Sequence, residues 1–163
     1  MATIETLRSD HLPALYPLHA RAVPHAAGVS YEAFTEAHNP LFGWIVRNGG
    51  PGMVGCLTLT HVLPGFSAVL HGFVLPEHHG GWLSRAILRR VSESVFGGLG
   101  LQRLSSYALE GVTDQAAAFL ERIGFRREGT IRRGHALPCG NFADLHLYGL
   151  LREECRWYEG GGG

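Results

Sequence analysis

The hydrophobic and polar positions of this chain follow two periods, one typical of strands and one typical of helices. Short apolar or alternating runs predict strands at Thr3–Leu7, Phe42–Arg47, Met53–His61, Ala68–Leu75, Leu101–Leu109, Arg126–Arg133 and Phe142–Leu151. Apolar residues spaced three or four apart predict helices at Leu12–Ala22, Tyr31–His38, Trp82–Phe96 and Asp114–Ile123. The order β-α-α-β-β-β-α-β-α-β-β indicates an α+β domain.

Local signals set the limits of these elements. Ser30 is a typical N-terminal helix cap, and Gly124 suits a left-handed C-terminal cap. The run Ala68–Leu75 is almost wholly apolar, which is typical of a central strand covered on both faces. We expect one domain over residues 1–157, because the sequence contains no repeat and no linker. The glycine-rich tail, residues 158–163, is expected to be disordered.

Composition narrows the function. Fourteen basic and fourteen acidic side chains balance in 163 residues, so no global field favours nucleic acid, and we expect nucleic-acid binding not to be the main activity. No apolar run is long enough to span a membrane, and no signal peptide is recognisable, so we expect a cytoplasmic protein with no membrane partner. Cys56, Cys139 and Cys155 form neither a disulfide framework nor a CxxC zinc site, and Cys56 is expected in the core.

The segment Phe73–Leu88 carries the strongest functional signal. It reads as an apolar strand that ends before Pro76, passes the pair Gly80-Gly81 and enters an amphipathic helix. The first turn of a helix offers unpaired N–H groups and the positive end of the helix dipole, so phosphate is a natural ligand here.

A second segment, Ala116–Gly129, is a short helix closed by Gly124 and followed by a new strand. In this order and about forty residues apart, the two segments resemble the GNAT acyltransferase superfamily. Within it, Ile123–Arg132 and Asn141–Arg152 resemble the ribosomal-protein N-terminal acetyltransferase branch. The resemblance implies the GNAT acyl-CoA N-acyltransferase fold, with a mixed central sheet of about seven strands and about four flanking helices.

The resemblance also implies a reaction. Acetyl-CoA would serve as co-substrate, and a primary amine would take the acetyl group directly, without a covalent enzyme intermediate and without a metal. The acceptor would be a small molecule or a peptide, and the protein a monomer or homodimer.

The chain departs from the family at two places. The phosphate loop of the family has Gln or Arg, Gly, and Gly or Ala at positions that read His79, Trp82 and Ser84 here. The helix before Gly124 has Thr113 and Leu120 where many members have an Asn and a Tyr, so the tyrosine that would protonate the leaving thiolate is absent.

Candidate site residues follow from these patterns. Those expected to bind the cofactor are Phe73, Val74, Leu75, His79, Gly80, Gly81, Trp82, Leu83, Ser84 and Arg85. Those expected to bind the acceptor are Asp144, His146 and Tyr148, which alternate and so share one side of the last strand. The alternative is that this side is a solvated outer face.

His71 interrupts the apolar strand and is the candidate general base, because a neutral imidazole can accept the ammonium proton. The alternative is a core histidine hydrogen-bonded to a neighbour. On the next strand, Tyr107 and Ser106 are expected to face the same cleft. Tyr107 could replace the missing acid or could be a packed aromatic.

Three classes of protein therefore remain open. The first is an acetyl-CoA-dependent N-acetyltransferase. The second has the same fold but altered or lost catalysis, and binds CoA or another protein. The third binds nucleic acid through Arg85, Arg89 and Arg90. The pair His78 and His79 is weak evidence for a metal, because no acidic or cysteine partner stands at ligand spacing.

Overall fold

The computed structural model describes residues 1–26, 28–38, 40–79 and 83–160. Its helices and strands are β1 Ala2–Thr6, α1 Leu12–Ala22, α2 Tyr31–Ala37, β2 Gly43–Asn48, β3 Met53–Leu63, β4 Ser67–Val74, α3 Arg85–Ser92, β5 Arg103–Leu109, α4 Asp114–Ile123, β6 Arg126–Ala136 and β7 Phe142–Leu151. The strands are hydrogen-bonded in the order β1-β2-β3-β4-β5-β7-β6, with β4 and β5 parallel. The predicted α+β fold with a mixed seven-stranded sheet and four helices is confirmed.

The predicted limits differ most from the structure at the helix after β4 and at the end of β6. The helix expected from Trp82 begins at Arg85, and its α-helical part ends at Ser92. It continues as a π-helix over Glu93–Gly98, where the N–H of Leu99 donates to the carbonyl of Ser94, five residues back. The strand predicted to end at Arg133 extends to Ala136, because β6 pairs with β7 as far as that residue.

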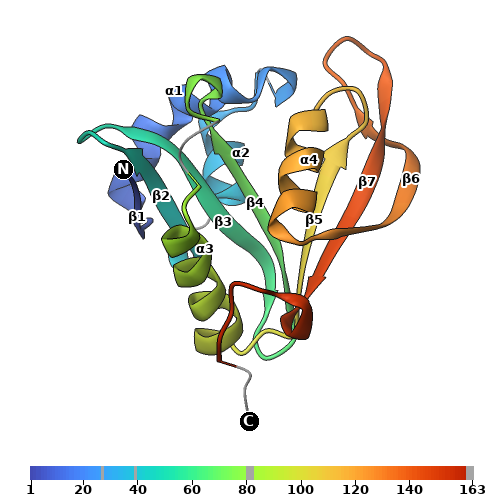
Figure 1. The fold of residues 1–163 in the computed structure, drawn as a ribbon. Coiled ribbons are helices and arrows are strands. Elements are labelled where there is room, and N and C mark those ends of the chain that lie inside the picture. The colour runs from blue at the N-terminus through green and yellow to red at the C-terminus, as the bar shows by residue number, and fades with distance from the viewer. Residues whose placement is uncertain (27, 39, 80–82, 161–163) are drawn as a thin grey trace. The chain divides into compact units, whose positions relative to one another are not determined.

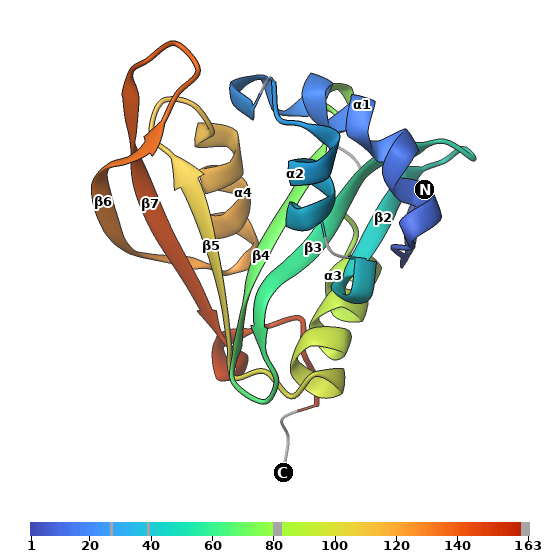
Figure 2. The same cartoon turned by 180° about the vertical axis from the view of Figure 1, so that it is seen from behind.

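The chain forms two compact units, and the first comprises residues 1–61 and 70–90. In it, β1, β2 and β3 pair as an antiparallel meander. Helices α1 and α2 lie on one face of these strands and α3 lies on the other (Figures 1 and 2). Its core consists of Leu7, Leu12, Leu15, Phe34, Ile45, Cys56 and Phe73. The core position predicted for Cys56 is confirmed.

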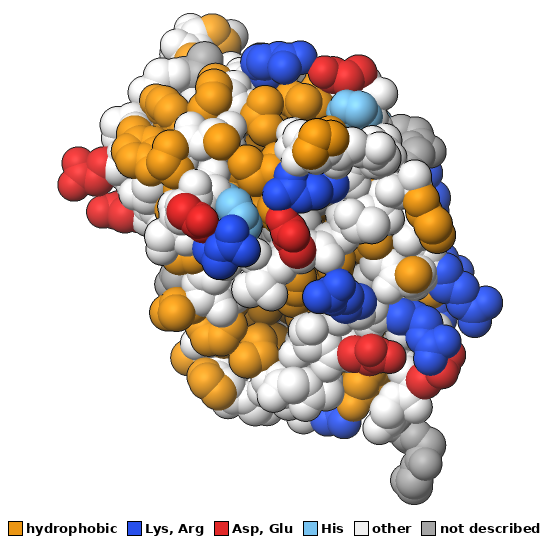
Figure 3. Space-filling model, turned by 90° about the vertical axis from the view of Figure 1, so that its left-hand side faces the viewer, with side chains coloured by type: hydrophobic (Ala, Val, Ile, Leu, Met, Phe, Trp, Pro, Cys, Tyr) orange, Lys and Arg blue, Asp and Glu red, His pale blue; other side chains and the backbone are white. Residues whose placement is uncertain are grey.

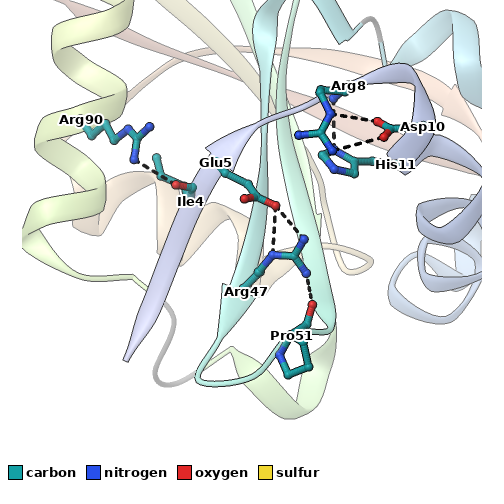
Figure 4. Close-up of polar contacts among 8 residues, drawn as sticks. All are labelled: Ile4, Glu5, Arg8, Asp10, His11, Arg47, Pro51 and Arg90. Atoms are coloured by element: carbon teal, nitrogen blue, oxygen red, sulfur yellow. Dashed lines mark hydrogen bonds and ion pairs between the residues drawn. The ribbon is translucent and has the colours of Figure 1, made fainter.

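Polar contacts fix the edges of this first unit (Figure 4). The guanidinium of Arg47 on β2 donates to Oε1 of Glu5 on β1, with Nη2 at 2.6 Å, and also to the carbonyl of Pro51 in the following turn. The hydrogen bond from Arg47 lowers the pKa of the Glu5 carboxyl group. Arg90 of α3 donates to the carbonyl of Ile4 at 3.1 Å, which ties the helix to β1.

The second unit comprises residues 62–69 and 91–163. The first residues of β4 pair in parallel with β5, from Ser67 opposite Arg103 to Val69 opposite Ser105. Strand β7 pairs antiparallel with both β5 and β6, and α4 covers one face of these strands (Figures 1 and 2). The left-handed cap predicted at Gly124 is confirmed, with a φ of +112°.

Coverage of β4 differs from the expectation. Leu70, Phe73 and Val74 are buried, but His71 is half-buried and Gly72 is exposed. The expectation that both faces of this strand are covered along its whole length was therefore wrong. At the other end of the chain, the hydroxyl of Tyr158 accepts a hydrogen bond of 3.0 Å from the guanidinium of Arg152, at the start of the tail expected to be disordered.

Candidate functional site

The N-terminus of α3 is capped by Ser84. The Ser84 hydroxyl accepts from the N–H of Ile87 at 3.2 Å, and its carbonyl accepts from the N–H of Leu88 at 3.1 Å. Ser84 thereby satisfies one of the donors that a helix N-terminus leaves unpaired. This local cap explains why the helix starts at Arg85. Gly80, Gly81 and Trp82, which complete the expected phosphate loop, lie outside the described residues.

The end of β4 presents backbone groups to two sides. The N–H of Leu75 donates to the carbonyl of Val54 at 2.8 Å, toward β3. The Phe73 carbonyl points the same way, and a side chain at Gly55 would collide with it. Because backbone groups alternate along a strand, those of Val74 point away from β3. Of the three residues expected to hold the cofactor by backbone groups, only Val74 presents them on that side.

His79 connects the loop after β4 back to the strand. Its Nε2 lies 2.8 Å from the carbonyl oxygen of Val74. A carbonyl only accepts hydrogen bonds, so the proton of this contact resides on Nε2. The neighbouring His78 contacts the side chain of Asn48 instead, with 3.2 Å between Nδ1 and Nδ2.

His71, the predicted base, shares one face of β4 with Phe73, two residues on. Its side chain is half-buried. Burial lowers the pKa of His71, and the neighbouring His38 and His61 lower it further. The imidazole is therefore neutral at pH 7 and carries a lone pair that can accept a proton.

A cluster of two histidines and two phenylalanines covers this face of β4, and the sequence reading did not single out its histidines. The His19 ring lies 5.2 Å from the rings of both Phe34 and Phe73, between ring centroids. His38 stacks on Phe34 at 4.4 Å and meets His19 edge-on at 5.3 Å. The spacing of His19 from Leu15, and of His38 from Phe34, is four residues in each case, which is the one signal that could have found them.

Burial shifts both histidines of this cluster. It lowers the pKa of His19 to about 4, helped by His38 and His25. It also lowers the pKa of His38, against the effect of its hydrogen bond to the Phe34 carbonyl at 2.9 Å. Both histidines of the cluster are neutral at pH 7, so the rings together form an apolar environment around Phe73.

In the second unit, Tyr107 and Ser106 do not face the same way. Tyr107 is 41% exposed, whereas Ser106 is 7% exposed, as expected of successive residues on opposite faces of a strand. The expectation that both face one cleft was wrong. Leu120, at the position of the missing tyrosine, is buried in α4.

Asp144, His146 and Tyr148 have intramolecular partners. The Tyr148 hydroxyl donates to Glu121 of α4 at 3.2 Å, and burial followed by Glu121 raises the pKa of Tyr148. Nδ1 of His146 lies 2.9 Å from Nη2 of Arg127. His146 and Tyr148 are buried, so the alternative of a solvated outer face holds for neither.

Asp144 is half-buried and holds the neighbouring strand. Its Oδ1 accepts from the N–H of Arg133 at 2.7 Å. Within the described residues, no group of three or more His, Cys, Asp or Glu side chains could hold a metal ion. In the same part of the chain, no helix combines the length and apolarity needed to cross a membrane.

Arginine side chains do not form a uniform basic surface on the face shown in Figure 3, where they stand among Asp and Glu. Of the three arginines considered for nucleic acid, Arg90 donates to the Ile4 carbonyl. Part of its donor capacity is therefore used within the protein.

Comparison with solved structures identifies the fold as that of the GNAT N-acetyltransferases. The ribosomal-protein-S18-alanine N-acetyltransferase from Escherichia coli superposes with a TM-score of 0.74 at 24% identity, over 93% of this chain and 94% of that chain. The spermidine N-acetyltransferase from Vibrio cholerae, solved in complex with CoA and spermine, has a TM-score of 0.75 at 18% identity, over 94% and 96% of the two chains. A structure described as a putative acetyltransferase has a TM-score of 0.69 at 21% identity, over 94% and 84%. No protein-family model matches the sequence, and no curated protein matches it.

Proposed function

We propose that this protein transfers an acetyl group from acetyl-CoA to a primary amine, directly and without a covalent enzyme intermediate. The observation that carries the proposal is His71, a neutral imidazole on β4, in a fold shared with proteins solved as N-acetyltransferases. A titratable side chain within an apolar strand costs stability unless a partner or a function offsets that cost.

The end of β4 supports binding of the pantetheine arm. The N–H and carbonyl of Val74 point away from β3 and can pair with the amides of an extended ligand, as an added strand would. The carbonyl of Val74 already accepts from His79, but a carbonyl oxygen has two lone pairs and can accept twice. His79 thus orders the loop beside the arm without closing the strand.

The pyrophosphate would lie at the loop before α3. The residues proposed there remain His79, Gly80, Gly81, Trp82, Leu83, Ser84 and Arg85. The positive end of the α3 dipole and the guanidinium of Arg85 both favour an anion. Because Ser84 occupies the N–H of Ile87, the phosphate would rely on the donors that precede it.

The chemistry requires one bond to form and one to break. The amine nitrogen attacks the thioester carbonyl carbon, the carbonyl electrons move to oxygen, and the C–S bond then breaks to release CoA thiolate. His71 accepts the proton that the amine nitrogen loses. A pKa below 6.5 keeps His71 in its accepting form at pH 7, although it makes the imidazole a weaker base.

The leaving thiolate needs little help. A thiol pKa near 8.5 makes CoA thiolate a tolerable leaving group in water. Leu120 cannot donate a proton, and Tyr107 is the proposed donor because its hydroxyl belongs to an exposed side chain.

The acceptor is proposed to approach the face of β7 that carries Asp144. The second oxygen of this carboxylate can attract an ammonium group, since Oδ1 is the one bound to Arg133. His146 and Tyr148 are buried, and they would form the inner wall of this site. The acceptor would be a peptide or a small amine, and the compartment is proposed to be the cytoplasm.

The alternative is a protein of the same fold that binds CoA but has lost efficient transfer. Leu120 and the capped Ser84 are the observations that favour it. A single experiment separates the two. Acetyl-CoA would be incubated with a panel of amines that includes spermidine and peptides with a free N-terminal alanine, while released thiol is measured and acetyl-CoA binding is followed by calorimetry. Binding with acceptor-dependent thiol release supports the enzyme, binding without release supports the alternative, and no binding at millimolar acetyl-CoA removes both.

A further inference from the structure

Two arginines of β6 project from a bulge whose shape is held by the neighbouring strand. The register of β6 and β7 shifts between Ile131 and His135, so that Arg132 and Arg133 have no residue directly opposite them. Arg133 has a φ of +52°, in the left-handed region that costs an ordinary side chain about 1–2 kcal/mol. The bond from its N–H to Asp144 stabilises this conformation. The backbone that carries these two arginine side chains therefore has a fixed conformation.

These two arginines differ from Arg103 and Arg126 of the second unit. Arg103 pairs with Glu128, and Arg126 pairs with Glu154 at 3.0 Å. Neither Arg132 nor Arg133 forms an ion pair within the described residues. Their charge is available to a ligand.

The surroundings favour an extended chain over a small molecule. Arg132, Arg133 and Asp144 line an open hollow of about 620 Å³. Small-molecule sites usually enclose most of their ligand, and this hollow does not. On the same hairpin, Ile131 is 49% exposed and Phe142 is 58% exposed, and they offer apolar contact area on its two opposite faces.

Strand β6 also ends the sheet. It pairs with β7 on one side, and the strand order shows no strand on its other side in the described part of the chain. An edge strand can add an extended peptide through backbone hydrogen bonds.

We propose that the β6–β7 hairpin binds an extended acidic segment of a partner protein. Carboxylates of the segment pair with Arg132 and Arg133, for which bidentate guanidinium contacts are well suited. Its apolar side chains lie on Ile131 and Phe142. The three side chains that line the hollow carry a net charge of one positive unit, two arginines against Asp144, so binding favours acidic segments and is sensitive to salt. Because Asp144 is also the group proposed to attract the amine acceptor, the acidic segment and the acceptor would occupy overlapping sites and exclude each other.

The test is a direct binding measurement that does not depend on acetyl transfer. A short peptide of alternating glutamate and valine, labelled at its N-terminus with a fluorophore, is titrated with the full chain and followed by anisotropy. We expect it to bind about tenfold more tightly than the same peptide with glutamine in place of glutamate. The double variant Arg132→Gln/Arg133→Gln is expected to remove that preference.

A matched control is Arg126→Gln, which removes one cation from the same strand but one that is already paired with Glu154. Its affinity for the acidic peptide should stay within about twofold of the parent, because an exposed ion pair contributes little. Circular dichroism checks that each variant is folded. Equal binding of the glutamate and glutamine peptides would overturn the proposal. Equal losses of affinity for the acidic peptide in Arg126→Gln and Arg132→Gln would also overturn it. The same holds if duplex DNA binds the protein more tightly than the peptide does.

Discussion

The imidazole of His79 donates a hydrogen bond of 2.8 Å to the carbonyl of Val74, and so joins the loop after β4 to the last residue of that strand. If this bond orders the loop for the cofactor, His79→Phe should weaken acetyl-CoA binding by about three- to tenfold, which corresponds to one hydrogen bond. Calorimetry measures the change.

The neighbouring histidine supplies the control for this prediction. His78→Phe removes a ring that contacts Asn48 and not β4. It should leave acetyl-CoA affinity nearly unchanged. Equal losses in the two variants would show that the Val74 contact has no special role.

His71 is tested by its effect on turnover. His71→Gln should lower kcat by about 10²-fold or more, because the transition state loses its base, while acetyl-CoA affinity stays nearly intact. Burial lowers the pKa of His71, so the activity of the parent should rise with pH through an apparent pKa below 6.5 and then level off.

The core-histidine alternative predicts the opposite pattern for the same variant. The melting temperature would fall, and the protein that stays folded would turn over normally. The control is His78→Gln, which makes the same substitution at a histidine outside β4. Full activity in a destabilised His71→Gln protein would exclude His71 as the base.

Two serines cap helices of the first unit in the same way, which provides a matched pair. The hydroxyl of Ser84 accepts from Ile87, and that of Ser30 accepts from Ala33 at 3.1 Å. Replacing either serine by alanine should lower the free energy of unfolding by about 1 kcal/mol. Only Ser84→Ala should also change acetyl-CoA affinity, and a similar change in Ser30→Ala would attribute the effect to stability alone.

Stability should fall in acid because of the histidine cluster. Burial lowers the pKa of His19 to about 4, so the unfolded chain binds more protons than the folded chain between that value and 6.5. The free energy of unfolding should therefore be constant above about pH 7 and decrease as the pH falls toward 4.

His19 is partly accessible to solvent, so its share of this loss is on the order of 1–2 kcal/mol after screening. Denaturant titrations of His19→Gln from pH 7 to pH 4 should show a flatter dependence than the parent. His135→Gln, which changes an exposed histidine of β6, should reproduce the parental slope. A parental slope in His19→Gln as well would show that other groups cause the acid loss.

The sequence alone determined the order of the elements and many of their limits. Phe142–Leu151 was predicted to the residue, as were the helices Leu12–Ala22 and Asp114–Ile123. These features follow from hydrophobic period, caps and turn residues, which act between residues close together in the chain. The same local signals placed Cys56 in the core, where it is buried.

The tertiary structure decided which groups meet. His19 on α1 and Phe73 on β4 are far apart in sequence, and no local pattern relates them. The opposite orientations of Ser106 and Tyr107 follow from the strand period, and the structure fixed which of the two is buried. The bond from His79 to Val74 and the bulge at Arg133 depend on the exact course of the backbone, which residue types do not specify. Periodicity shows which face of an element is apolar, whereas packing determines which side chains from other elements lie against that face. The candidate base His71 could therefore be predicted from the sequence, but the cluster of His19, Phe34 and His38 around it could not.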